Sequence, residues 1–137
     1  MALYYVDTSA VVKTILEEPE STELARFISG ADLCSCELLL TEVPRACRRS
    51  AKAVGGAALR SLLEQAAAQL ATIGLLPLDQ EVLSQAGGLV EPALRSLDAI
   101  HVAAAVRLSP LDGFVTYDER QAAAARLAGL RTYSPGV

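Results

Sequence analysis

The chain lacks the features that mark secreted and membrane proteins. Its N-terminus has neither a basic segment nor the long apolar segment of a signal peptide, and it opens on the strand-like run Leu3–Val6. No apolar stretch reaches the length of a membrane-spanning helix. The three cysteines, Cys34, Cys36 and Cys47, are an odd number, and too few soft ligands lie near the first two for a zinc site. We therefore expect reduced, buried thiols, a cytoplasmic location and no membrane contact.

Several motifs of phosphate and nucleotide enzymes are also missing. No Gly-x-Gly-x-x-Gly follows a strand-like run, as a dinucleotide-binding domain requires, and nothing marks a nucleophile elbow. A receiver domain needs an acidic pair after its first strand and a lysine after a late one, whereas this chain has the single Asp7 and only Lys13 and Lys52. A phosphatase of the haloacid dehalogenase type needs a second aspartate where Ser9 stands.

Size and composition favour one compact domain with surplus apolar surface. The 137 residues suit a single domain, expected to span 1–137. Apolar residues make up 52%, charged residues 20%, and the mean hydropathy is +0.33. Because this is more apolar than a typical soluble chain, we expect a homodimer in which surplus apolar surface is buried.

The negative net charge argues mildly against a nucleic-acid partner, but the distribution of the basic residues does not. The net charge is −4 and the pI is about 5.0, whereas nucleic-acid binders usually carry basic patches. Four basic residues nevertheless recur at spacings that place most of them on one helical face. They could bind RNA phosphates, contact an acidic partner, or form a solvated surface. These residues are Arg45, Arg48, Arg49 and Lys52.

Strand-like runs alternate with helical patterns along the whole chain. This alternation predicts an α/β fold, in which a central parallel sheet of four to five strands is flanked by helices. Pro44 lies inside one expected helix and should favour a kink there. The expected strands cover 3–6, 33–35, 75–78, 113–117 and 130–133, and the expected helices cover 9–16, 21–28, 38–50, 57–73, 80–86, 97–108 and 118–127.

Four acidic residues occupy positions that this fold would bring together. Asp7 follows the first strand, Asp118 follows the strand expected over 113–117, and Asp98 opens the helix that leads into that strand. Right-handed crossovers place the carboxyl ends of parallel strands at one edge, where ligands bind. Glu42 is expected well inside its helix, so it reaches this edge only through the way the helix packs.

Clustered carboxylates point to a hard divalent cation, because like charges resist sharing one site. Mg²⁺ or Mn²⁺ is the expected ion, and phosphate-ester chemistry the expected reaction. Asp7 and Asp98 are the best candidates for direct ligands. Glu42 and Asp118 could bind a second ion, hold metal-bound waters, or accept the proton of an attacking water. The hydroxyls expected to orient waters beside the acids belong to Ser9 and Thr116.

Each acid also has a plain structural interpretation. Asp7 and Asp118 are good helix N-caps, and Asp98 in a first turn favours the positive end of a helix dipole. Glu42 could pair with Arg45 three residues later. Ser9 and Thr116 could serve only as a cap and a strand end, and the single histidine, His101, is expected to be a packed helix residue. The joint placement of the acids favours the functional interpretation.

Four segments around the acids form a recognisable set. The most specific is Ser96-Leu97-Asp98-Ala99-Ile100-His101-Val102-Ala103-Ala104-Ala105; the others are Val6-Asp7-Thr8-Ser9-Ala10, Glu42 followed by Arg45-Ala46, and Val115-Thr116-Tyr117-Asp118. Together they resemble the PIN domain, and more narrowly a VapC-type toxin, the ribonuclease half of a VapBC toxin–antitoxin pair. The resemblance implies a Mg²⁺- or Mn²⁺-dependent endoribonuclease, commonly dimeric and neutralised by a VapB-type antitoxin, with Asp7, Glu42, Asp98 and Asp118 as its acidic quartet. The alternatives are a housekeeping PIN nuclease of RNA processing and a catalytically silent, RNA-binding PIN domain.

Overall fold

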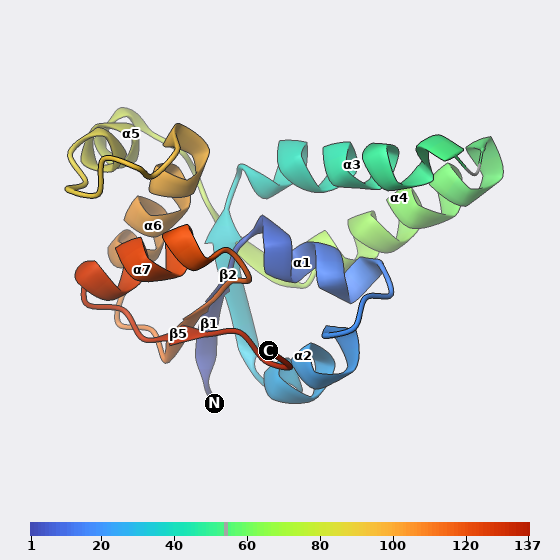
Figure 1. Cartoon of the computed structure of the whole chain (residues 1–137), viewed down its shortest axis with the longest axis horizontal. Coiled ribbons are helices and arrows are strands. Elements are labelled where there is room, and N and C mark those ends of the chain that lie inside the picture. The colour runs from blue at the N-terminus through green and yellow to red at the C-terminus, as the bar shows by residue number, and fades with distance from the viewer. Residues whose placement is uncertain (54) are drawn as a thin grey trace.

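The computed structural model describes residues 1–53 and 55–137. In this part of the chain, five strands form one sheet and seven α-helices surround it (Figure 1). The strands are β1 (Leu3–Val6), β2 (Asp32–Cys36), β3 (Ile73–Leu76), β4 (Gly113–Val115) and β5 (Thr132–Tyr133). The helices are α1 (Thr8–Ile15), α2 (Ser21–Ile28), α3 (Leu39–Ser50), α4 (Gly56–Leu70), α5 (Gln80–Gly87), α6 (Ser96–Leu108) and α7 (Glu119–Leu127), and a 3₁₀ turn, Ala51–Ala53, follows α3.

The sheet is parallel throughout, which confirms the expected α/β class. Its strand order is β3-β2-β1-β4-β5. The chain builds outward from β1 through β2 to β3, then crosses back to add β4 and β5 on the other side. The direction in which strands are added therefore reverses between β1 and β4. In open parallel sheets, ligands bind at the carboxyl ends of the two strands on either side of such a reversal. The segments that follow β1 and β4 meet there, where the Asp7 N–H bonds the Val115 carbonyl at 3.2 Å.

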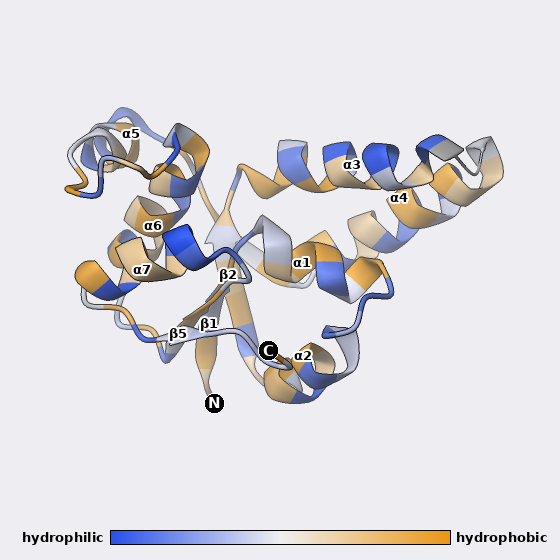
Figure 2. Cartoon of the chain, viewed as in Figure 1, coloured by the Kyte–Doolittle hydropathy of each residue, from blue (hydrophilic) through white to orange (hydrophobic). Residues whose placement is uncertain are grey.

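Helices cover both faces of the sheet, and each face has its own apolar core (Figures 1 and 2). Paired residues of β1 and β4 alternate between these cores. Tyr5 and Phe114 stack at 5.1 Å between ring centroids and pack with α5, α6 and α7. Val6 and Val115, one residue further along, pack with α1 to α4. This period of two is the one that a pleated strand imposes.

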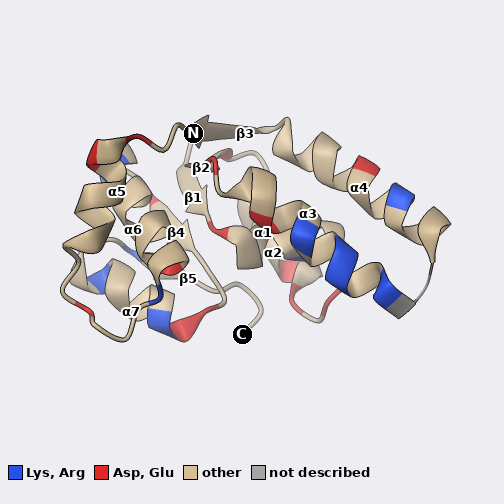
Figure 3. Ribbon diagram, turned by 90° about the horizontal axis from the view of Figure 1, so that it is seen from above, with Lys and Arg blue, Asp and Glu red and all other residues tan. Residues whose placement is uncertain are grey.

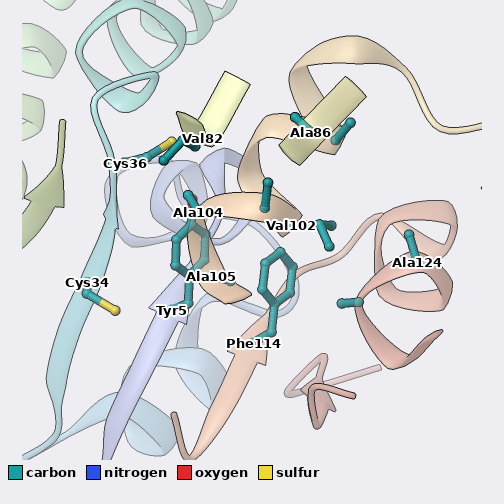
Figure 4. Close-up of a cluster of buried hydrophobic side chains, with 13 residues drawn as sticks. Tyr5, Cys34, Cys36, Val82, Ala86, Val102, Ala104, Ala105, Phe114 and Ala124 are labelled. Carbon is teal, nitrogen blue, oxygen red and sulfur yellow. The ribbon is translucent and has the colours of Figure 1, made fainter. Parts of the chain in front are cut away.

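Small side chains let α6 lie close to the sheet. Ala103, Ala104 and Ala105 are buried around Val102, and Figure 4 shows Ala104 and Ala105 beside the rings of Tyr5 and Phe114. Because the helix is apolar over most of its circumference, it is enclosed rather than amphipathic. The first turn of α6 is polar, lies at the carboxyl edge of the sheet and contains Asp98.

Most of the expected elements are present, and the clearest errors surround β3. We expected a helix over 57–73 and a strand over 75–78, but α4 ends at Leu70 and β3 begins at Ile73. Ile73 is buried and pairs with Leu33 of β2, so sheet pairing overrides the helical spacing that includes it. β3 ends before Pro77, which has no N–H to donate to a neighbouring strand.

The strands β4 and β5 are also shorter than expected. We expected strands over 113–117 and 130–133, but β4 ends at Val115 and β5 contains only Thr132 and Tyr133. The cysteines are free and buried, as expected. No helix in the described ranges is both long and apolar enough to cross a membrane.

Candidate active site

Asp7 is a buried carboxylate at the centre of the carboxyl edge. It is 3% exposed and caps α1, since its Oδ1 accepts the Ala10 N–H at 3.0 Å. The Ser9 hydroxyl donates to the same oxygen at 2.7 Å, and the Thr116 hydroxyl donates to Oδ2 at 2.6 Å. Burial raises the pKa of Asp7 although these bonds oppose it. The capping interpretation and the proximity of both hydroxyls are therefore confirmed together.

Asp118 and Asp98 lie at the starts of α7 and α6. Asp118 caps α7 by accepting the Gln121 N–H at 3.0 Å, and the Gln121 side-chain amide reaches the Asp98 backbone carbonyl at 3.3 Å and its carboxylate at 3.4 Å. The pKa of Asp98 is raised by burial first, and then by the negative charges of Asp118, Asp7 and Glu42. The other three predicted acids therefore all lie within electrostatic reach of Asp98.

Glu42 reaches the site because it lies in the first turn of α3, not well inside the helix as we expected. Its N–H still bonds the Leu38 carbonyl at 2.8 Å, and α3 runs unbroken past Pro44. The Glu42 Oε1 atom is held by the Thr8 hydroxyl at 2.7 Å and by His101 Nε2 at 2.8 Å. Burial raises the pKa of Glu42, but the bonds with His101 and Thr8 outweigh it and lower that pKa overall.

His101 is the packed helix histidine that we expected, with 2% of its surface exposed. Sequence reasoning missed its contacts: Nδ1 lies 2.8 Å from the Tyr5 hydroxyl and 3.7 Å from the Cys36 sulfur, while Nε2 faces Glu42. Burial disfavours the imidazolium, yet the bonds with Cys36 and Glu42 raise the pKa of His101 to about 10. Its position one helical turn after Asp98 was the available signal.

Two further polar residues connect the acids and were not predicted as part of the site. Thr8 links α1 to Glu42, and the buried Gln121 lies between Asp98 and Thr116. The Thr116 hydroxyl donates to Asp7 and accepts the Asp118 N–H at 3.1 Å, so one side chain connects the two acids. The position of Thr8 next to Asp7 was its only sequence signal, and no pattern singled out Gln121.

The donor set suits a hard cation, although the carboxylates are spread apart. Among residues 1–53 and 55–137, no group of three or more His, Cys, Asp or Glu side chains is close enough to hold a metal ion as it stands. The converging groups are nevertheless carboxylates, and burial together with their negative charges raises the pKa of Asp98. Mg²⁺ keeps several of its waters and binds through one or two carboxylates, which fits a wide cluster better than a closed cage.

A hollow of about 570 Å³ opens beside these acids. Its lining includes Asp98 and Asp118 together with Arg95 and Arg120. Cationic side chains next to a carboxylate cluster suit a substrate that carries phosphates. The sequence offered no pattern that singled out these two arginines.

Comparison with known protein families agrees with this geometry. The PIN domain model matches residues 4–127. This chain belongs to the PIN domain family. It is 39% identical to Ribonuclease VapC46 of Mycobacterium tuberculosis (strain ATCC 25618 / H37Rv), with 98% of this chain and 99% of that protein covered. It is 36% identical to Ribonuclease VapC47 of Mycobacterium tuberculosis (strain CDC 1551 / Oshkosh), with 98% of each covered. The resemblance to VapC-type PIN domains is confirmed.

A solved structure supports the PIN fold independently of sequence. The crystal structure of VapBC2 from Rickettsia felis, bound to a DNA fragment from its promoter, superposes with a TM-score of 0.65 and covers 96% of this chain and 97% of that one. The sequences are 13% identical, so this likeness concerns the fold alone.

In this PIN domain the predicted basic residues line α3 and the turn that follows it. Arg45, Arg48 and Arg49 are exposed on α3, where Figure 3 shows the basic residues in a row, and Lys52 is exposed in the turn. The positive charge of Arg49 contributes to the lowered pKa of Glu42, so this part of the helix lies within electrostatic reach of the site. The role of these four residues in RNA binding stays a prediction.

Proposed function

We propose that this PIN domain is a metal-dependent endoribonuclease, the toxin of a VapBC-type toxin–antitoxin pair. The observation that carries the proposal is the hydrogen-bond network that brings the acids to one edge of the sheet. The Thr116 hydroxyl bonds the Asp7 carboxylate and the Asp118 N–H, and Gln121 connects Thr116 to Asp98. Thr8, next to Asp7 in the chain, holds Glu42. Four carboxylates at one edge of a sheet repel one another and lower its stability unless a cation or a positively charged ligand offsets their charge. RNA cleavage is the reaction that this cluster and the ribonuclease names of the relatives support together.

Mg²⁺ or Mn²⁺ would be held by Asp7 and Asp98, with Glu42 and Asp118 at the side. When bound, such an ion polarises the phosphate and lowers the pKa of a bound water. Asp7 is already fixed by Ser9 and Thr116, which keeps its carboxylate in one orientation. Glu42 and Asp118 would hold metal waters or a second ion, or accept the proton of the attacking water. Ser9 and Thr116 would also orient water.

The RNA would approach over the hollow beside Asp98 and Asp118. Arg95 and Arg120 in its lining are placed to contact phosphates next to the scissile bond. The basic row on α3, from Arg45 to Lys52, would then hold the backbone further along the strand.

The partner of this toxin would be a VapB-type antitoxin, and the toxin itself would be a homodimer acting in the cytoplasm. The toxin assignment is supported by relatives named VapC that match this chain from end to end. A housekeeping nuclease of RNA processing would have the same chemistry. A short neighbouring reading frame that encodes a DNA-binding protein would favour the toxin over that alternative.

The decisive test is cleavage of purified total RNA with Mg²⁺, with Mn²⁺ and with EDTA. We expect metal-dependent cuts by the wild type, and loss of at least 100-fold in rate on removing one ligand through Asp7→Asn or Asp98→Asn, roughly the range of losing a key charge-stabilising group. Asp79→Asn is the matched control, because Asp79 also caps a helix by accepting the Val82 N–H at 2.9 Å and lies beside Arg107 in the last turn of α6, whereas Asp98 is in the first turn. Full activity in either site variant would overturn the assignment. Absence of both cleavage and calorimetric metal binding in the wild type would leave an RNA-binding PIN domain.

A further inference from the structure

We infer that His101 is a positioning residue that orients the Glu42 carboxylate for the metal-dependent reaction, and that Tyr5 fixes the ring of His101. This inference rests on the proposed function and deepens it, because His101 acts through Glu42 rather than on the substrate. The three side chains come from β1, α6 and α3, so the arrangement joins elements that are distant in the sequence.

The hydrogen-bond geometry determines which nitrogen of His101 carries a proton. An ionised carboxylate only accepts hydrogen bonds, and Glu42 Oε1 lies 2.8 Å from His101 Nε2. Nε2 must therefore donate, whether the ring is neutral or charged. The Thr8 hydroxyl donates to the same Oε1 at 2.7 Å. Because both donors hold one oxygen, Oε2 is the oxygen that Glu42 can offer to a cation or to a metal-bound water.

The ring of His101 is well placed to hold this orientation. Its Nδ1 lies 2.8 Å from the hydroxyl of Tyr5, which is fully buried and stacked on Phe114. The Tyr5 and His101 rings also meet edge to face, with centroids 5.8 Å apart. A ring held on two sides by packed aromatic and polar groups has little freedom to turn. Protein groups that orient metal ligands in this way are typically worth 10- to 100-fold in metal affinity.

A buried histidine could instead serve packing alone, and the two roles make different predictions. If His101 only fills space, a side chain of similar volume should replace it without changing metal binding. If it positions Glu42, the replacement must also supply a hydrogen-bond donor at the Nε2 position. His101→Leu fills the space without a donor, and His101→Gln supplies an amide donor of similar reach.

The experiment measures Mn²⁺ affinity of the full chain by calorimetry, RNA cleavage at saturating Mn²⁺, and thermal unfolding in EDTA. We expect His101→Leu to weaken Mn²⁺ binding about tenfold, and His101→Gln to recover most of this loss. Tyr5→Phe, which keeps the aromatic ring and removes the anchoring hydroxyl, should weaken binding less than His101→Leu. In a Glu42→Gln background, His101→Leu should cause no further loss, because the group it acts through is already altered.

Two outcomes would overturn the inference while the proposed function stands. One is a folded His101→Leu variant with the wild-type Mn²⁺ affinity, and the other is an equal loss with and without Glu42→Gln. If His101→Leu does not fold, Tyr5→Phe and His101→Gln decide instead. Positioning is contradicted if Tyr5→Phe keeps the wild-type Mn²⁺ affinity while His101→Gln binds Mn²⁺ more weakly than the wild type. A wild-type chain that neither binds Mn²⁺ nor cleaves RNA would overturn the proposed function, and this inference with it.

Discussion

Asp7 combines a structural task with a functional one in a single side chain. It caps α1 through the Ala10 N–H and is enclosed by the hydroxyls of Ser9 and Thr116. Burial raises its pKa, so the folded protein holds a proton on Asp7 more tightly than the unfolded chain does. The charged form therefore costs stability near neutral pH, which is typical of a site organised for a ligand.

Asp7→Asn should stabilise the metal-free protein at pH 7 by about 1 kcal/mol, the usual scale for relieving a strained functional site. Asparagine can still cap α1, and its amide can donate to the Thr116 oxygen. The Thr116 hydroxyl then turns to Gln121 Oε1, which lies 3.1 Å away. The gain should be present above the folded pKa of Asp7 and should shrink as pH falls toward the pKa of the unfolded carboxyl, because protonated Asp7 is also neutral. Thermal unfolding in EDTA across pH 4 to 8 measures this difference.

The control for this substitution is Asp79→Asn, which changes an exposed cap of α5 whose side chain is 58% accessible. It should change the unfolding midpoint little and without the same pH dependence. A destabilised Asp7→Asn variant at pH 7, or a gain that grows toward acid, would contradict the expected cost of the buried charge.

At the scale of elements, α3 links the acids to a basic surface. Its first turn carries Glu42 into the site, and its exposed side continues through Arg45, Arg48 and Arg49 (Figure 3). The charge of Arg49 already reaches Glu42. Along a helix the rise is about 1.5 Å per residue, so the row from Arg45 to Arg49 extends over roughly 6 Å, a length that suits contacts to neighbouring phosphates.

Neutralising Arg48 and Arg49 together by substitution with Gln should weaken RNA binding and reduce its dependence on salt. Removing one phosphate-binding charge should lower the slope of log affinity against log salt by roughly 0.7 for single-stranded RNA. Binding is measured with Asp7→Asn in the background so that the RNA stays intact. Arg26→Gln on α2 is the control, since Arg26 is 72% exposed and pairs with Glu23 instead. An unchanged slope would assign this surface of α3 to another partner.

At the scale of the whole molecule, the sheet separates two cores, and apolar side chains remain outside both. Among the exposed large apolar residues, Leu40 is 53%, Leu83 45%, Leu97 49% and Leu127 66% accessible. Single apolar residues are common on protein surfaces. In this acidic chain they accompany a mean hydropathy of +0.33, so surplus apolar surface is seen in both the composition and the structure.

The chain should therefore self-associate at micromolar concentration, as predicted from its composition. Sedimentation velocity over a concentration series measures the mass directly, and a dimer mass that persists at high salt would indicate apolar rather than ionic contact. A monomer mass throughout the series would contradict the prediction and leave the exposed apolar residues for an antitoxin.

Local signals were enough to predict most elements and the placement of Asp7, Asp98 and Asp118 at strand and helix ends. Asp7 caps α1 and Asp118 caps α7, as their positions before helical patterns indicated. The region around β3 was predicted wrongly, because Ile73 fits the spacing of α4 as well as a strand and only its pairing with Leu33 decides between them. The start of α3 was predicted to within one residue, but the expectation that Glu42 lies well inside the helix was wrong, because its position falls in the first turn.

The sequence by itself determined the alternation of strands and helices, the parallel sheet and the acids at strand and helix ends, because each of these follows from spacing along the chain. The tertiary structure decided which groups surround those acids. Tyr5, Glu42 and His101 are separated by dozens of residues, and Gln121 joins α6 to α7 from the interior. Such contacts depend on how the helices pack on the sheet, and spacing along one chain carries no information about the distance between two packed elements.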